Sequence, residues 1–462
     1  TDTVKDIEQR GMLQYNSSYQ LYDLHPVVRG VATSLIKKNE ANQYGQRVID
    51  YFSSLSHQPY IQASSLDDVS TGLQVVQTLL RLQRFEEAAD AYQGDLAEAL
   101  VFSLEAYEDI LALLHPFFPF GWNELPKIAY WRTTPLINYA AIALAEKGEI
   151  ETAISAYSAA ILLELNQEAW RTVDGLLNNI SYYLPSQNLL AKSSRIIFLN
   201  HSLSDIIKIK EDELFLNMLL IFNFQTIIGN WNEAEFTWQQ LEPMVHSCPG
   251  HYRQGQAEYL FALNRFKQGL LQITHILSAE KIARAGNNRF TLRNICILRG
   301  NWLLEQGEWS LSAVSFHDAI TMARERGLCD EESETGLALA KLHLGQFHSP
   351  DEARHEAERL SGLRKPARRY LAMLWREIGD LEQAKKYALA AYKWAWADGE
   401  PYVNRYELDK TTELLRELNM PVPDLPPYDP AKDEPFPWEA DVRKAIEKLR
   451  VEKAAKQTAE ET

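Results

Sequence analysis

The stretch EIGDLEQAKKYA, from Glu377 to Ala388, carries the pattern that decides the fold of this chain. One helical segment stops at Gly379, and the next starts at Leu381 with a small residue, Ala384, three positions later. Glycine ends helices readily because it adopts the left-handed backbone conformation at little cost. The small residue lets two helices approach closely, and the large residue after the turn fills the space between them. The stretch therefore predicts a helical hairpin.

The same arrangement recurs along the chain. It is found in LQRFEEAADAY (82–92), EKGEIETAISAY (146–157), IGNWNEAEFTW (228–238), ALNRFKQGLLQI (262–273), EQGEWSLSAVSF (305–316) and HLGQFHSPDEA (343–353). From residue 231 onward the large residues stand at 231, 266, 309, 347 and 381, in steps of 35, 43, 38 and 34. The wider gaps before them hold a degenerate turn at 181–195 and an aromatic, proline-rich insertion at 113–128. Such a period is typical of stacked helix–turn–helix units.

Over roughly residues 66–399 this pattern resembles the tetratricopeptide-repeat (TPR) family, whose units are about 34 residues long. The resemblance implies an all-α fold, a TPR-like right-handed helical solenoid of about eight to nine helical pairs. A non-repetitive helical array is the alternative interpretation. Beyond the repeats, seven prolines between residues 421 and 437 prevent a helix and favour an extended chain.

The opening segment differs from everything that follows. Two strand-like runs, 12–15 and 20–24, are joined by the turn residues 16–18 and predict a β-hairpin. Pro26 follows His25 and is suited to the first turn of a helix. With the helical run VKDIEQRG (4–11) before it, this arrangement predicts the tail of a winged-helix domain.

The residues IEQRGMLQY (7–15) and YQLYDLHPVVRGVA (19–32) resemble the end of the winged-helix domain in bacterial STAND-class NTPases, signalling ATPases with NB-ARC or NACHT modules. Leu24 and His25 fall where that family carries a Met-His-Asp or Leu-His-Asp motif, and Pro26 replaces the aspartate. The resemblance implies that His25 contacts the β-phosphate of ADP held by an upstream NTPase domain. A helix-capping role for His25 is the alternative.

No catalytic motif stands out. The sequence contains no G-x-x-x-x-G-K-[ST] phosphate loop, so we expect no enzymatic activity and no cofactor in this chain. ADP or ATP is implied only for a full-length STAND protein. HSCPGH (246–251) resembles a metal cluster but lacks a fourth nearby ligand, which favours a turn between repeats and no metal site.

The composition limits which classes of partner and which cellular compartment are expected for this chain. The chain of 462 residues carries 63 acidic and 47 basic residues, a formal charge of −16 that disfavours nucleic acid as a partner. The longest apolar run, 213–231, is interrupted by asparagine and glutamine, which indicates a buried helix and no membrane span. Three scattered cysteines and the absence of a signal peptide favour the cytoplasm.

Two segments are candidates for partner binding. One is the aromatic insertion, with Phe117, Phe118, Phe120 and Trp122. The other is the basic segment 362–379, with Arg364, Arg368 and Arg369. A solvated helix face is the alternative reading of the basic segment, and an inward-folded plug is that of the aromatic one.

The sequence thus predicts four regions: a winged-helix tail and connecting helices (1–60), a TPR-like solenoid (61–400), a capping helix with a proline-rich segment (401–439) and a charged terminal helix (440–462). The predicted function is recognition. As the sensor of a STAND NTPase, the solenoid would bind a protein or peptide trigger, relieve autoinhibition of its own NTPase domain and permit oligomerisation, with antiphage defence as one setting. A stand-alone TPR scaffold or adaptor and the sensor of a STAND transcription regulator are the alternatives.

Overall fold

The structure is a computed structural model of the 462-residue chain, and it describes residues 2–16, 21–25, 27–28, 31, 38–247 and 255–461. Contacts divide the chain into two units, Thr1–His57 with Asp67–Tyr92, and Gln58–Leu66 with Gln93–Thr462.

The first unit contains α1 (Asp2–Gln9), β1 (Leu13–Asn16), β2 (Leu21–Leu24), α3 (Lys38–Ser54), α4 (Ser70–Arg81) and α5 (Phe85–Tyr92). β1 pairs with β2 in antiparallel register, with Leu13 opposite Leu24. The backbone N–H of His25 extends the pairing by donating to the carbonyl of Met12 at 3.0 Å. A short hairpin does not identify a winged-helix domain, so that assignment stays a prediction. Most of the helix expected after Pro26 lies outside the described residues.

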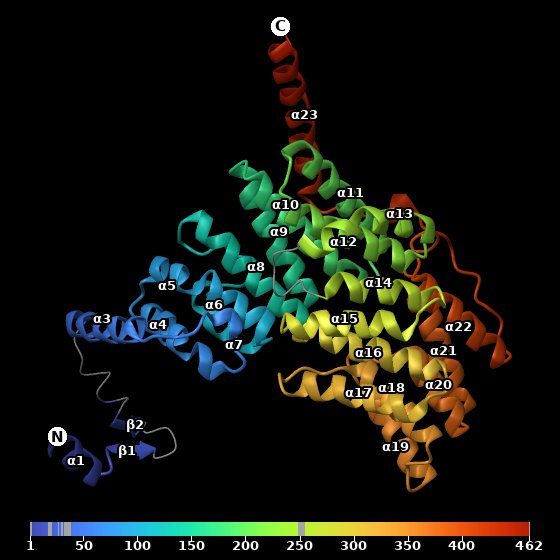
Figure 1. Ribbon diagram of the computed structural model, residues 1–462, viewed down its shortest axis with the longest axis horizontal. Helices are drawn as coiled ribbons and strands as arrows, with labels where there is room; N and C mark the ends of the chain where they lie inside the picture. The colour runs from blue at the N-terminus through green and yellow to red at the C-terminus, as the bar shows by residue number, and fades with distance from the viewer. Residues whose placement is uncertain are drawn as a thin grey trace. The chain divides into compact units, whose positions relative to one another are not determined.

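The second unit is a solenoid-like array of helices, apart from an extended segment between α22 and α23 (Figure 1). Its helices are α6 (Asp95–Glu98), α7 (Tyr107–Leu114), α8 (Tyr130–Glu146), α9 (Ile150–Asn166), α10 (Trp170–Tyr183), α11 (Leu190–Ile207), α12 (Glu211–Ile228), α13 (Trp231–Leu241), α14 (Gln256–Lys267), α15 (Ile273–Ala285), α16 (Arg289–Glu305), α17 (Trp309–Arg324), α18 (Glu331–His343), α19 (Pro350–Ser361), α20 (Arg368–Ile378), α21 (Leu381–Trp396), α22 (Arg405–Glu417) and α23 (Glu439–Glu461). From α10 to α22, each even-numbered helix also contacts the next even-numbered one. The predicted array of helical pairs is confirmed in this form.

The turns between paired helices have the predicted chemistry. Gly307 has a φ of 74° and α17 begins at Trp309, while Gly379 has a φ of 90° and α21 begins at Leu381. A side chain in this left-handed region would strain the backbone. Glycine therefore ends the first helix and lets the second turn back against it.

One predicted turn was wrong. Phe266 does not open a second helix; it lies near the end of α14, buried against Tyr406. The turn follows at Gly269, which has a φ of 72°, and α15 begins at Ile273. The glycine three residues after Phe266 had the spacing expected of a small residue within the second helix. It is instead the residue that makes the turn.

Small residues set the distance between neighbouring pairs around Phe316. This side chain of α17 is fully buried. A Cβ atom at Gly300 of α16 or at Gly336 of α18 would lie 2.6 or 2.5 Å from its ring. Both contacts are shorter than packed atoms tolerate, so the two glycines admit the aromatic ring between consecutive pairs.

The array returns on itself. α12 contacts α22, and Tyr406 of α22 packs with residues of α14 and α16. The amide of Asn188 donates to the carbonyl of Trp394 at 2.7 Å, and the backbone N–H of Ala191 donates to Asp398 at 2.8 Å. Contacts between residues about two hundred positions apart therefore close the helical array within the second unit.

The proline-rich segment 419–439, called the strap below, runs across this closure. Its first half lies against the last helical pair: Leu425 packs on that core, and the indole of Trp396 donates to the carbonyl of Pro426 at 2.9 Å. Its second half does not. Trp438 is fully buried, and its indole N–H donates to the hydroxyl of Ser158 in α9 at 3.1 Å.

Ion pairs hold the same end of the strap. Arg195 of α11 contacts Asp433 and binds Glu439 through both carboxylate oxygens at 3.0 Å. A bidentate arginine–carboxylate pair fixes orientation as well as distance. The strap therefore joins the last helical pair to α9 and α11, and α23 continues from it along α11.

A buried polar cluster joins α10, α11 and α12. Asp174 accepts hydrogen bonds from the hydroxyl of Ser204 and from the amide of Asn217. Burial raises the pKa of Asp174 from its ordinary value of 3.8 to about 6. The folded state therefore holds the Asp174 proton more tightly than the unfolded state does.

This shift predicts a pH dependence. The stability contributed by protonated Asp174 is fully present below pH 3.8 and is lost as the pH rises through about 6, a loss of roughly 3 kcal/mol. Thermal unfolding of Asp174→Asn should lack this loss between those pH values. Asp205→Asn, at an exposed position of α11, is the control and should behave as the wild type. Identical pH profiles for Asp174→Asn and the wild type would contradict the prediction.

Candidate functional site

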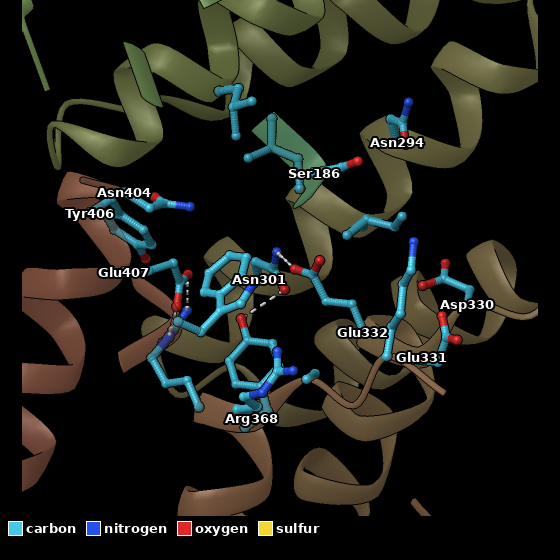
Figure 2. Close-up of a pocket in the computed structure, with 18 of the residues that line it drawn as sticks. Ser186, Asn294, Asn301, Asp330, Glu331, Glu332, Arg368, Asn404, Tyr406 and Glu407 are labelled. Carbon is cyan, nitrogen blue, oxygen red and sulfur yellow. Dashed lines mark hydrogen bonds and ion pairs between the residues drawn. The ribbon is translucent and has the colours of Figure 1, made fainter. Parts of the chain in front are cut away.

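A polar cavity of about 780 Å³ lies inside the second unit. Residues of α14, α16, α18, α20, α21 and α22 line it, together with the turn between α10 and α11 (Figure 2). Its volume falls in the range of pockets that hold small ligands. The helices that line it are distant in sequence, so the cavity depends on closure of the array.

Each lining helix places particular residues there. Asn294 and Asn301 are seven positions apart in α16 and share one helix face. Lys267 ends α14, Glu332 lies in the first turn of α18, and Arg368 begins α20. These even-numbered helices therefore each contribute polar side chains to the lining, beside apolar ones such as Leu263 and Ile297.

Part of the lining is internally paired. The amide of Asn301 donates to Glu332 at 2.8 Å, and the hydroxyl of Tyr370 donates to the carbonyl oxygen of Asn301 at 2.8 Å (Figure 2). Arg369 binds both oxygens of Glu407 at 2.8 and 3.1 Å. Burial raises the pKa of Glu332. These hydrogen bonds and the ion pair link α16, α18, α20 and α22 on this part of the cavity lining.

Two further ionisable residues of the lining, Arg293 and Glu146, have partners that do not themselves line this cavity. Arg293 donates to Glu105 at 3.1 Å, and Glu105 is almost completely buried. Glu146 accepts a hydrogen bond from the hydroxyl of Tyr183 at 3.4 Å, and burial raises the pKa of its carboxyl. Ionised and ionisable groups are thus enclosed together.

Several lining residues have no partner. Within the described part of the chain, neither a hydrogen bond nor an ion pair is found for Lys267, Lys365, Arg368 or Asn294. Burial lowers the pKa values of Lys267 and Arg368. The side-chain oxygen of Asn404 is buried and likewise accepts no hydrogen bond. Lys365 is exposed, and Lys267, Arg368 and Asn294 are partly buried, so this wall offers polar groups with which a ligand could pair.

A smaller cavity of about 400 Å³ adjoins the first, since Glu146 and Phe290 line both. Its lining combines apolar side chains with tyrosines and amides, among them Tyr182 and Asn178. The carbonyl oxygen of the Asn178 side chain is buried and accepts no hydrogen bond. The two cavities therefore share part of their walls, and the smaller one has the less polar lining.

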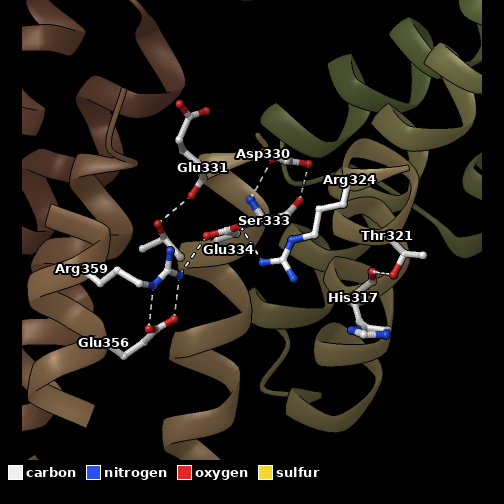
Figure 3. A network of polar contacts seen from close by, with 10 residues as sticks. His317, Thr321, Arg324, Asp330, Glu331, Ser333, Glu334, Glu356 and Arg359 are labelled. Carbon is white, nitrogen blue, oxygen red and sulfur yellow. Dashed lines mark hydrogen bonds and ion pairs between the residues drawn. The ribbon is translucent and has the colours of Figure 1, made fainter. Parts of the chain in front are cut away.

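Another charged cluster, outside the cavities, is fully paired. Glu334 of α18 accepts hydrogen bonds from Arg324 and Arg359 at 2.9 Å each, and Arg359 also binds Glu356 at 2.8 Å (Figure 3). These contacts tie α17, α18 and α19 together. The cluster leaves no charge for a ligand, which distinguishes it from the cavity lining.

The aromatic insertion is only partly available for binding. Phe117 and Phe118 are 3% and 2% exposed, so their prediction as surface contacts is corrected: both belong to the core. Trp122 is half-buried, with its ring centroid 5.2 Å from that of Phe118. Phe120 is 84% exposed. Only Phe120 of the four is largely exposed, so the insertion does not present them as one surface.

The basic segment is divided as well. Arg364 is exposed and donates to the carbonyl of Lys147 at 3.4 Å. Arg368 lines the cavity, whereas Arg369 is engaged by Glu407. The three arginines do not form one external surface, and Arg369 stabilises the closure of the array.

His25 is half-buried, and its Nδ1 accepts a hydrogen bond from the backbone N–H of Val27 at 3.4 Å. A nucleotide contact by His25 stays a prediction. In HSCPGH, Cys248 and His251 lie outside the described residues. The described part of the chain contains no group of three or more His, Cys, Asp or Glu residues placed to hold a metal ion. Nor does it contain a helix long and apolar enough to cross a membrane.

Sequence reasoning missed most of the cavity. Lys267, Asn294 and Glu332 received no functional interpretation, and Arg368 was assigned to an external patch. One signal was available: Asn294 and Asn301 place amides on one face of a helix that is otherwise apolar on its buried sides. The other lining residues meet only through contacts between distant helices. Neither a scan against models of protein families nor a search of curated proteins found a match for this chain.

Proposed function

We propose that this chain is a recognition module that binds a small molecule or a short peptide inside the closed helical array. The observation that carries the proposal is the 780 Å³ cavity, which is partly open to solvent and whose lining includes charged and amide side chains without a partner among the described residues. A site of this size suits a ligand that is largely enclosed and leaves no room for a folded protein. Binding rather than catalysis is proposed for this chain.

The wider role follows the resemblance of the first forty residues. The chain is proposed to be the TPR-type sensor of a bacterial STAND NTPase, with a right-handed solenoid behind a winged-helix tail. ADP or ATP would be bound by an upstream NTPase domain, where His25 would contact the nucleotide. Ligand binding in the cavity would relieve autoinhibition and permit oligomerisation, in antiphage defence or in control of transcription. A phosphate loop encoded upstream of Thr1 in the same reading frame would support this role.

The alternative is a stand-alone TPR scaffold or adaptor that uses its exterior. Phe120 and Trp131 favour it, because their side chains are 84% and 59% exposed. Exposed aromatic side chains are common at protein interfaces. The two functions differ in where the partner binds.

Native mass spectrometry of the full chain after incubation with a bacterial extract of metabolites and short peptides distinguishes them. We expect bound mass in the wild type and its loss in Asn294→Trp, since the indole would occupy the cavity. Phe120→Ala is the control and should retain the bound mass. Ser186→Trp, which adds bulk at an exposed position of the cavity lining, is a second blocking variant. If both blocking variants retain the bound mass and Phe120→Ala loses it, the ligand binds on the exterior surface and the cavity is not the binding site.

A further inference from the structure

The ionisable side chains that line the cavity differ in whether they can become neutral when they have no ion-pair partner. A carboxyl group can become neutral by taking up a proton, and burial raises the pKa values of Glu146, Glu331 and Glu332 in that direction. A guanidinium group cannot become neutral in a protein. Arg368 therefore remains charged in the cavity wall, and no ion pair is found for it in the described part of the chain.

The other arginines of the lining already have carboxylates. Arg369 is bound by Glu407, and Arg293 is bound by Glu105. Arg368 and Lys267 have no ion pair in the described part of the chain, and burial lowers the pKa values of both; for Lys267 the charges of Glu407 and Glu332 partly oppose this shift. They come from different helices, α20 and α14, and line one cavity. The closed array places both residues in the lining of the same cavity.

We infer that the cavity binds an anionic group of its ligand, a carboxylate or a phosphate, and that Arg368 and Lys267 are the residues that pair with it. The inference rests on the proposed function and names the chemical class of its ligand. Lys365 adds positive charge at the same wall, and the amide of Asn294 supplies a further donor. Charge-assisted hydrogen bonds from these groups are stronger than those between neutral groups.

The test uses two probes, inorganic phosphate and acetate, titrated into the full chain at constant ionic strength. Lysines are labelled by reductive ¹³C-methylation, and the Lys267 resonance is assigned by its loss in Lys267→Arg. At least one probe should shift this resonance with saturation and raise the pKa of Lys267, because an adjacent anion favours the charged amine. A response to phosphate alone assigns a phosphate ligand, a response to acetate alone assigns a carboxylate, and a response to both assigns either anion.

Variants locate the site. In Arg368→Gln the dissociation constant of the responding probe should increase about tenfold or more, the effect of losing one charge-assisted contact. Arg368→Lys keeps the charge and should bind within a few-fold of the wild type. Arg364→Gln is the matched control: it removes an exposed arginine of the same segment that does not line the cavity. Thermal unfolding should confirm that all three variants fold.

No saturable response of Lys267 to either probe would overturn the inference, as would equal affinity in Arg368→Gln and the wild type. This failure is distinct from failure of the proposed function. A neutral or cationic ligand recovered from the wild type and excluded by Asn294→Trp would leave the recognition module in place and refute the anion site.

Discussion

Trp438→Ala should cost the chain about 3–5 kcal/mol of stability and detach the second half of the strap. The indole is fully buried, donates to Ser158, and stacks on Phe436 with ring centroids 5.2 Å apart. Its removal leaves a cavity between the strap and α9 that the extended, proline-rich backbone cannot easily refill. Thermal unfolding measures the loss, and hydrogen exchange over residues 419–439 measures the release.

Trp131→Ala is the matched control for this experiment. Its indole is 59% exposed, so its removal should change the stability by about 0.5 kcal/mol at most. Because the strap joins the last helical pair to α9 and α11, its release should also loosen the contacts that close the array. Equal stability losses in the two variants would show that the strap does not hold the closure.

Arg293→Met should be the second large effect, again about 3–5 kcal/mol. The pair between Arg293 and Glu105 is buried, with side-chain exposures of 11% and 1%. Removing the guanidinium leaves the Glu105 carboxylate buried without a counter-ion, which costs more than the pair itself contributes. Chemical denaturation of the variant at neutral pH measures this cost.

A double variant shows whether the loss comes from the unpaired charge of Glu105 or from lost packing of the Arg293 side chain. In Arg293→Met with Glu105→Gln, the buried charge is gone, and most of the stability should return. Arg289→Met removes an arginine from the same helix whose partner, Glu325, is 56% exposed, and it should cost less than about 1 kcal/mol. A double variant as unstable as Arg293→Met alone would mean that packing, rather than the unpaired charge, accounts for the loss.

The helical pairs were largely predictable because their turns are local. Gly307 with Trp309, and Gly379 with Leu381, lie within three residues of each other, so the chain's own sequence determines where one helix ends and the next begins. The error at Phe266 has the same origin. Two turn phases fitted the spacing of aromatic residue and glycine, and only packing against Tyr406 distinguishes them.

The candidate site was mostly unpredictable for the opposite reason. Lys267 and Arg368 are about a hundred positions apart, and no local pattern relates them. Their side chains line one cavity because α22 packs against α12 and closes the array. The same closure engages Arg369 with Glu407, which removes it from the external patch that the run of arginines had indicated.

By itself the sequence determined that the chain forms paired helices, where most of the turns fall, and that the segment after residue 420 is extended. These features depend on backbone conformations and spacings within a few residues. The tertiary structure alone decided that the array closes, that Trp438 anchors the strap on α9, and that unpaired charges face an interior cavity. Those features depend on which distant surfaces bury each other, a sum over many weak contacts that no short stretch of sequence contains.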